Sequence, residues 1–245
     1  MSDISALEDT TAAEQPLAHA PTQPPAHAPG HAPAPPPALL AQRAYEELRD
    51  RLVTLRIKPG EPLDEDQIGR ELEMGRTPIR EAIKRLALEN LVSVFPRRGT
   101  FAAEINIKDL AHITDVRKVL EACAAGLAAE RLTDARRLEL EALIADLRSN
   151  RGTDDMSALM TLDTRVHRFI YRASDNPFLE ETLYRYFNLS LRIWYLVIDR
   201  LPHMFQRVHE HEDMLHAIAN RDAKLAREIV TEHIATFERE VRSVL

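Results

Sequence analysis

Apolar side chains recur every three or four residues through most of the chain from residue 38 onward, and this spacing predicts helices. In the first part of this region it predicts three helices, over residues 40–55, 64–72 and 77–89. Residues 92–95 and 100–103 are short apolar stretches around the turn 96–99, which is typical of a two-stranded hairpin. Two helices joined by a short turn that contains Gly75, followed by a hairpin, indicate a winged helix-turn-helix domain.

The helical spacing continues to the C-terminal end without the alternation that strands require. The helices that it predicts cover residues 107–131, 133–149, 156–173, 177–200, 204–219 and 222–244. Pro177 and Pro202 fit the starts of two of them, because proline is tolerated in the first turn of a helix. The predicted fold class is therefore mainly α: an N-terminal winged helix-turn-helix domain and a C-terminal all-helical bundle of about six helices.

Residues 1–37 differ in composition from the rest of the chain. They contain nine of the fifteen prolines and neither Lys nor Arg, and Pro, Ala and His alternate from His19 to Pro37. Such a stretch cannot bury enough apolar surface to offset the entropy lost on ordering, so we expect a disordered tail. The predicted domains are this tail over 1–37, the winged domain over 38–104 and the helical domain over 105–245.

The predicted helix over 77–89 has a recognisable start and a buried stripe. Thr77 suits the N-cap, because its hydroxyl can accept a hydrogen bond from a free backbone N–H of the first turn. Pro78 then falls at the first helical position, where a missing N–H costs nothing. The apolar residues that repeat at helical spacing and form the stripe are Ile79, Ala82, Ile83 and Leu86.

The outer face of this helix and the hairpin turn after it are basic. Between residues 76 and 98, six basic residues stand against two acidic ones, in a chain whose formal net charge is −7. The basic residues are Arg76, Arg80, Lys84, Arg85, Arg97 and Arg98. A cationic segment in an acidic protein is better explained by a phosphate partner than by general solubility, so we expect this surface to bind double-stranded DNA.

The composition argues against disulfide-rich, membrane and secreted proteins. Cys123 is the only cysteine, and its Ala-rich helical surroundings predict a small buried side chain in a reducing compartment. No apolar run approaches the roughly 20 residues of a membrane span. The N-terminal end lacks a basic start followed by an apolar core, so we expect no secretory signal and a protein of the cytoplasm.

Four residues of the helical part are candidate metal ligands. Asp163 and His167 are four residues apart on one predicted helix, so they project from the same face. His211 and His233 lie on two later predicted helices. On spacing alone, an Asp/His pair of this kind is more often solvated or satisfied within the fold than part of a metal site.

Two arginines of the helical part each have two interpretations. Arg117 and Glu121 are four apart, which fits either a helix salt bridge or an Arg117 side chain that binds a ligand carboxylate through two N–H groups. Arg192 lies mid-helix among apolar residues, where its guanidinium is either a second anion clamp or a structural charge. The nearby aromatic residues are interpreted as core and pocket wall, namely Tyr184, Tyr186, Phe187, Trp194 and Tyr195.

The N-terminal motifs resemble the DNA-binding domain of the GntR superfamily of bacterial transcription regulators. The resemblance covers roughly residues 42–103 and rests on Lys58-Pro59-Gly60-Glu61-Pro62-Leu63, on Arg76-Thr77-Pro78-Ile79-Arg80-Glu81-Ala82 and on Pro96-Arg97-Arg98-Gly99-Thr100-Phe101. One departure is Gly75, where the family usually has Ser. The resemblance implies that the DNA-binding residues are Arg76, Thr77, Arg80, Lys84, Arg97, Arg98 and Gly99. The acidic residues 64–66 imply that the helix before the recognition helix meets the DNA backbone less closely.

Residues 110–235 resemble the FCD ligand-binding domain of the FadR branch of this superfamily. The matching pieces include Val116-Arg117, Asp163 with His167, Asn176-Pro177-Phe178-Leu179, His211 with Met214-Leu215, and His233. In the metal-binding members one Asp and three His hold a divalent cation inside the bundle, and the corresponding residues here are Asp163, His167, His211 and His233. The resemblance implies a Zn, Ni, Mn or Fe ion with open positions for an effector carboxylate. Arg117 and Arg192 are the predicted effector-binding residues.

These features together predict a metabolite-responsive transcription regulator, a repressor that binds a palindromic operator as a homodimer. The effector is predicted to be a small carboxylate bound at the metal. No residue near the ligands is an obvious general base, so we do not expect an enzyme. The alternatives are a metal-dependent enzyme with a DNA-binding appendage, and an architectural DNA-binding protein whose metal is purely structural.

Overall fold

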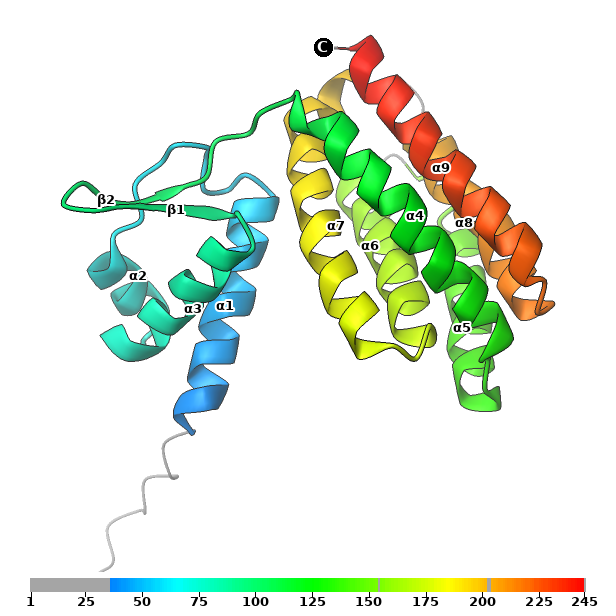
Figure 1. Cartoon of the computed structure of the whole chain (residues 1–245), viewed down its shortest axis with the longest axis horizontal. Helices are drawn as coiled ribbons and strands as arrows, with labels where there is room; N and C mark the ends of the chain where they lie inside the picture. The colour runs from blue at the N-terminus through cyan, green and yellow to red at the C-terminus, as the bar shows by residue number, and fades with distance from the viewer. Residues whose placement is uncertain (1–35, 154, 202–203, 245) are drawn as a thin grey trace, which may run out of the picture. The chain divides into compact units, whose positions relative to one another are not determined.

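The computed structural model describes residues 36–153, 155–201 and 204–244. Its winged part consists of α1 (Pro37–Val53), α2 (Glu65–Glu71) and α3 (Arg76–Leu88), followed by the strands β1 (Val92–Phe95) and β2 (Gly99–Ala102) (Figure 1). The helical part consists of α4 (Asp109–Glu130), α5 (Asp134–Ser149), α6 (Met156–Ala173), α7 (Pro177–Val197), the short 3₁₀ helix η1 (Ile198–Arg200), α8 (Met204–Ala219) and α9 (Ala223–Ser243). The predicted fold class, mainly α with a small wing, is confirmed.

The core of the winged part forms where α1 packs against α3. Leu48 and Leu52 of α1 are fully buried, and so are Ile79 and Leu86 of the predicted apolar stripe on α3. The two strands form an antiparallel hairpin in which Val92 pairs with Ala102 and Phe95 with Gly99. The wing turn needs a glycine at this last position, because the φ angle of Gly99 is +106°.

The start of α3 corrects the predicted N-cap by two residues, from Thr77 to Gly75. The N-cap is Gly75, none of the described side chains caps the helix, and Thr77 is its second residue. Pro78 is consequently the third helical residue rather than the first. The predicted position was wrong, but Pro78 still lies in the first turn of the helix. A proline is tolerated there, because the first four N–H groups of a helix have no partner within it.

Two further expectations need correction. Helix α1 begins at Pro37, so the last residue assigned to the tail belongs to the helix, whereas residues 1–35 lie outside the described residues. Cys123 is exposed rather than buried. The buried small residues of α4 are the neighbouring Ala124 and Ala125, and Cys123 falls on the outer face of the helix beside them.

Helix α4 is the centre of the helical part and packs against α6, α7, α8 and α9 (Figure 1). Polar N-caps fix where several helices begin: Asp155 accepts from the first turn of α6, Asn176 from that of α7 and Asp222 from that of α9. The helix predicted over 177–200 ends at Val197 and continues as η1. Pro202 lies outside the described residues. Within the described ranges, no helix combines the length and apolar character needed to cross a membrane.

Candidate functional site

Three helices bring the four predicted metal ligands together inside the bundle. Asp163 and His167 lie one turn apart on α6, His211 lies on α8 and His233 on α9. All four side chains are buried, and their ligand atoms lie within 4.8 Å of one another. Helical spacing accounts for the first two residues, while the packing of α8 on α6, and of α9 on α4 and α8, supplies the other two.

Hydrogen bonds on the far side of two imidazole rings fix which nitrogen faces the centre. The Nδ1 atom of His167 lies 2.9 Å from Oε2 of Glu121, and Nδ1 of His211 lies 3.0 Å from the carbonyl oxygen of Val208. A carbonyl and an ionised carboxylate only accept, so each Nδ1 must carry the hydrogen. In the neutral rings both Nε2 atoms therefore present lone pairs, and they do so 3.2 Å apart.

The carboxylate of Asp163 faces these lone pairs. Its Oδ1 lies 3.5 Å from Nε2 of His211 and 3.8 Å from Nε2 of His167. Among the described residues, neither carboxylate oxygen has a hydrogen-bond partner. Burial raises the pKa of Asp163 to about 6, and burial together with the neighbouring histidines holds the pKa of His211 well below its ordinary value. The carboxylate of Asp163 and the Nε2 atoms of His167 and His211 thus direct lone pairs at one another with no hydrogen between them. A cation bound among them would accept these lone pairs.

Glu121 of α4 connects this ligand set to a buried arginine. Its Oε1 accepts from Nε of Arg117 at 2.6 Å, and its Oε2 accepts from His167. Burial alone would raise the pKa of Glu121, but Arg117 and His167 outweigh burial and lower it to about 2. The other side of Arg117 donates to Oγ of Ser190 on α7 at 2.6 Å. Both interpretations of Arg117 from the sequence remain compatible, because the salt bridge exists and leaves the guanidinium beside the ligands.

A narrow cavity lies against the ligand set. Arg117, Ser190 and Trp194 line it together with two of the ligand imidazoles, His167 and His233. Apolar side chains from α7 and α9 close the remaining wall, and the space left is about that of one water molecule. A ligand carboxylate that entered here would meet both the metal ligands and Arg117.

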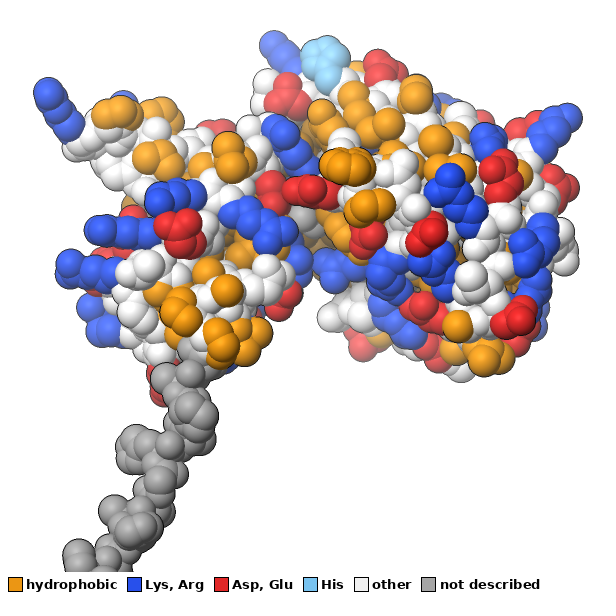
Figure 2. Space-filling model, turned by 60° about the horizontal axis from the view of Figure 1, so that its bottom comes forward, with side chains coloured by type: hydrophobic (Ala, Val, Ile, Leu, Met, Phe, Trp, Pro, Cys, Tyr) orange, Lys and Arg blue, Asp and Glu red, His pale blue; other side chains and the backbone are white. Residues whose placement is uncertain are grey.

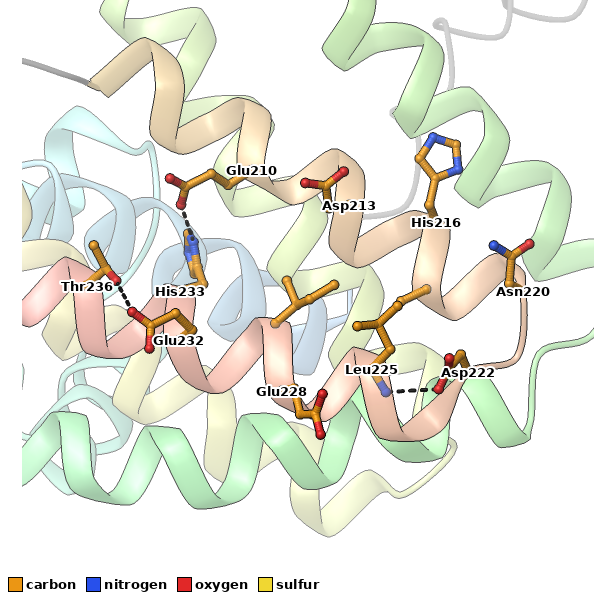
Figure 3. Close-up of a pocket in the computed structure, with 12 residues that line it drawn as sticks. Glu210, Asp213, His216, Asn220, Asp222, Leu225, Glu228, Glu232, His233 and Thr236 are labelled. Carbon is orange, nitrogen blue, oxygen red and sulfur yellow. Dashed lines mark hydrogen bonds and ion pairs between the residues drawn. The ribbon is translucent and has the colours of Figure 1, made fainter.

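A groove between α8 and α9 approaches the same ligand set from outside (Figure 3). Figure 3 shows Glu210 of α8 and His233 of α9 facing each other across it, and the glutamate Oε2 lies 3.6 Å from Nδ1 of the imidazole. The groove is acidic, since Asp213, Glu228 and Glu232 also line it. His233 thus contributes both to the groove and to the inner cavity.

The structure does not bring Arg192 to the ligand set. Arg192 is buried, and its guanidinium donates to the carbonyl oxygen of Ala103 at 2.6 Å. Burial lowers the pKa of Arg192 to about 10. It does not line the cavity that Arg117 lines, because it points from a different side of α7 than Ser190 and Trp194.

The predicted DNA-binding side chains are exposed on α3 and on the wing. Arg76 donates from two nitrogens to both carboxylate oxygens of Asp66, at 2.7 and 2.9 Å, and Arg80 bonds to Glu65 at 2.7 Å. Figure 2 shows how Lys and Arg side chains crowd the edge of the winged part with acidic side chains between them. The acids of α2 thus hold the arginines of α3 in the free protein, and a phosphate or base edge would have to replace them.

The other basic residues of this region divide into two groups. Arg85 lies over the ring of Tyr45, 3.6 Å from its centroid, and bonds to Glu89, so it braces α3 against α1. Lys84, Arg97 and Arg98 are exposed, the last two at the tip of the wing beside Gly99. Thr77 is exposed in the first turn of α3.

Three contacts of the site were not predicted from the sequence. Glu121 accepts from His167, the Val208 carbonyl accepts from His211, and Ser190 accepts from Arg117. The spacing of Arg117 and Glu121 was visible in the sequence and pointed to a salt bridge. Nothing in the sequence placed Glu121 beside His167, because that contact depends on how α4 packs against α6.

Comparisons with known proteins agree with this architecture. Residues 40–102 match the family model of bacterial regulatory proteins of the gntR family, and residues 112–236 match the model of the FCD domain. The chain is 24% identical over 203 residues to the HTH-type transcriptional repressor RspR of Escherichia coli (strain K12). These residues make up 83% of this chain and 89% of that protein.

Two other proteins are also similar. The gluconate operon transcriptional repressor of Bacillus subtilis (strain 168) is 28% identical over 197 residues, 75% of this chain and 77% of the repressor. The solved structure of E. coli McbR/YncC superposes with a TM-score of 0.74 at 24% identity, over 83% of this chain and 97% of that one, and so shares the fold. The chain belongs to the gntR family of bacterial regulatory proteins and carries an FCD domain, and it is a DNA-binding transcription regulator.

Proposed function

We propose that this regulator is a cytoplasmic repressor that binds a palindromic operator as a homodimer. Its operator affinity is controlled by a small carboxylate bound beside a divalent metal ion in the FCD domain. The metal ligands are Asp163, His167, His211 and His233, and Arg117 binds the carboxylate. The names of two relatives, both repressors, support the direction of regulation.

The observation that carries the metal part is the convergence of unsatisfied electron pairs at Asp163. Burial of a carboxylate without a hydrogen-bond partner destabilises the fold. The two imidazole lone pairs that face this carboxylate cannot donate a hydrogen bond to it. A divalent cation held there would offer open coordination positions to an effector oxygen. Glu121 and the Val208 carbonyl keep the two imidazoles in the orientation that such a cation requires.

The carboxylate acts on DNA binding through the balance between two arrangements of the dimer. Only one of them spaces the two α3 helices to fit successive major grooves. Effector binding shifts that balance only by its difference in affinity for the two arrangements. Arg117 is suited to this role because it is buried, charged and hydrogen-bonded to both α4 and α7.

The DNA part assigns the contacts of the recognition helix to two arginines and the positioning of the DNA backbone to other residues. Arg76 and Arg80 contact base edges or nearby phosphates from α3. The residues that position the DNA backbone are Thr77, Lys84, Arg97 and Arg98, and Gly99 also contacts DNA at the wing. The wing tip lies near the minor groove in this arrangement. In the free protein the acids of α2 pair with Arg76 and Arg80, and DNA takes the place of the acids on binding.

Selection of fragments of the host's genomic DNA on the purified full-length protein, followed by sequencing, tests this function. Enrichment of a short palindrome is the expected result, and its neighbouring genes would indicate the pathway of the effector. Recovery of fragments with no shared sequence would contradict a sequence-specific dimer.

Arg80→Ala is expected to weaken operator binding by about 1–3 kcal/mol per subunit and to relax specificity at one base position. The reason is the loss of a guanidinium that reaches a base edge from the exposed face of α3. Fluorescence anisotropy with the operator and with single-base variants measures both effects. Arg165→Ala is the matched control, because Arg165 forms a comparable exposed ion pair with Asp146 in the helical part. Equal affinity of Arg80→Ala and Arg165→Ala would refute the assignment.

Operator binding is also expected to depend steeply on salt. About four phosphate contacts per subunit give a slope of about −7 for log K against log[salt] in a dimer. The measurement is an anisotropy titration at several salt concentrations from about 50 to 200 mM. A nearly flat dependence would contradict binding through the basic face of α3 and the wing.

A further inference from the structure

The cavity beside the metal ligands contains a buried hydrogen-bond donor that the proposed function does not use. Trp194 on α7 lines this cavity and is 6% exposed. Among the described residues, its indole Nε1 has no hydrogen-bond partner. A buried N–H without an acceptor is rare and destabilising in folded proteins, so an unpaired one at a cavity wall indicates an acceptor that binds there.

A second donor lies one helical turn before it. Ser190 and Trp194 are four residues apart on α7, so both face the same side of the helix, and both line the cavity. Oγ of Ser190 accepts a hydrogen bond from Arg117 at 2.6 Å, which leaves its own hydroxyl hydrogen to donate elsewhere. The cavity therefore has an arginine, a hydroxyl and an indole on one wall, and all three are donors.

The charges around the cavity favour an anion as the acceptor. Arg117 is permanently protonated and the negative charge of Glu121 balances it. Among the buried groups on the cavity side of the ligand set, the charge of Asp163 balances only half of that of a divalent cation, so this side keeps a net positive charge once a cation is bound. The acids of the α8–α9 groove lie on the other side of His233 and do not line the cavity. A neutral ligand would satisfy the donors but not this charge, whereas a carboxylate satisfies both.

We propose that the indole N–H of Trp194 and the hydroxyl of Ser190 donate to one carboxylate oxygen of the effector. This inference rests on the proposed function and adds α7 to the metal ligands and Arg117 as the element that recognises the effector. The aromatic ring of Phe237 on α9, whose centroid lies 5.2 Å from that of Trp194, holds the indole in place. Because the cavity is narrow, effector binding displaces part of this wall, and small acids are preferred over large ones.

The chain offers a direct probe, because Trp194 is its only tryptophan. Full-length ¹⁵N-labelled protein loaded with Zn²⁺ gives one indole N–H cross-peak, which belongs to Trp194. Acetate is the probe anion and acetamide its neutral control. The expected result is a saturable downfield shift of the indole proton with acetate, and little shift with acetamide at the same concentration.

Calorimetry on three variants completes the test. Trp194→Phe keeps the ring but removes the N–H, and it is expected to weaken acetate binding about tenfold with unchanged Zn²⁺ stoichiometry. Ser190→Ala, which keeps the tryptophan, is expected to weaken acetate binding and to reduce the indole shift. Thr182→Val removes a hydroxyl from an exposed position of the same helix that does not line the cavity, and this control should bind acetate as the unchanged protein does.

Two outcomes would overturn the inference, and they differ in what else they overturn. Saturable acetate binding with an unmoved indole cross-peak and an unchanged affinity in Trp194→Phe would refute the role of Trp194 and leave the proposed function standing. No saturable acetate binding by the Zn²⁺-loaded protein would refute both this inference and the carboxylate effector of the proposed function.

Discussion

Asp163→Asn is expected to abolish the stabilisation of the protein by divalent metal ions and to raise the stability of the metal-free protein. At a metal concentration about a thousandfold above the dissociation constant, binding stabilises the folded chain by about 4 kcal/mol. For a chain of this size, that corresponds to a rise of roughly 8–16 °C in melting temperature. The amide cannot replace the carboxylate as an anionic ligand, so this rise should disappear.

The gain in the metal-free protein has a separate cause. Burial raises the pKa of Asp163 to about 6, above its ordinary value, so at neutral pH the folded protein holds a charge that the unfolded chain solvates better. That penalty is present above pH 6 and is relieved as the pH falls toward 4 and the carboxyl takes up a proton. The amide of Asn carries no charge and can donate to the two imidazole lone pairs, which should stabilise the metal-free fold by about 1–3 kcal/mol at pH 7.

Thermal unfolding with chelator and with added Zn²⁺ measures both effects. Asp146→Asn is a suitable control, because this aspartate is half-buried on α5, away from the ligand set, and pairs with Arg165. The control should keep the full metal-dependent rise. Retention of that rise in Asp163→Asn would show that the metal binds elsewhere.

Glu121→Leu is expected to destabilise the protein by about 3–5 kcal/mol. The substitution leaves Arg117 buried without its carboxylate, and an uncompensated buried charge has a penalty of that size. Glu130→Leu is the matched control on the same helix, because Glu130 forms an exposed ion pair with Arg227 at 2.8 Å and should contribute no more than about 1 kcal/mol. Urea unfolding of both variants measures the difference, and similar losses in the two would contradict a buried charge network.

The pH dependence of stability provides an independent check on Glu121. Its pKa is lowered to about 2 in the folded protein, so the stabilisation from its ionised form is fully present above the ordinary value near 4.5. This stabilisation is lost as the pH falls from about 4.5 toward 2. The difference in unfolding free energy between the unchanged protein and Glu121→Gln should therefore shrink over that interval. A difference that stays constant down to pH 2 would contradict the lowered pKa.

The elements of the fold could be predicted from the sequence because each has a local signal. The strand at 92–95 was predicted with its observed bounds, and α6 likewise, since apolar spacing and the Asp155 cap define it. Local signals were less reliable where two of them competed. Thr77 is a good N-cap residue, but Gly75 holds the extended conformation at the start of α3.

The candidate site could be predicted only in part. The spacing of Asp163 and His167 was visible, but the two other histidines were joined to them by family resemblance and not by any local pattern. Features that depend on how the helices pack left no signal in the sequence. Examples are the contact of Glu121 with His167 and the indole N–H of Trp194, which has no partner in the described part of the chain. For Arg192 the signal in the sequence was misleading. An arginine among apolar residues suggested an anion clamp, whereas its guanidinium donates to a backbone carbonyl.

Operator affinity with and without metal tests the central claim most directly. The same preparation of the full-length protein is stripped with chelator, reloaded with Zn²⁺, and titrated in both states against the selected operator. Coupling between the metal site and the DNA-binding surface predicts affinities that differ by at least about fivefold, and no difference in Asp163→Asn. Equal affinities of the stripped and reloaded protein, with Zn²⁺ binding confirmed in the same samples, would contradict metal-dependent control of this regulator.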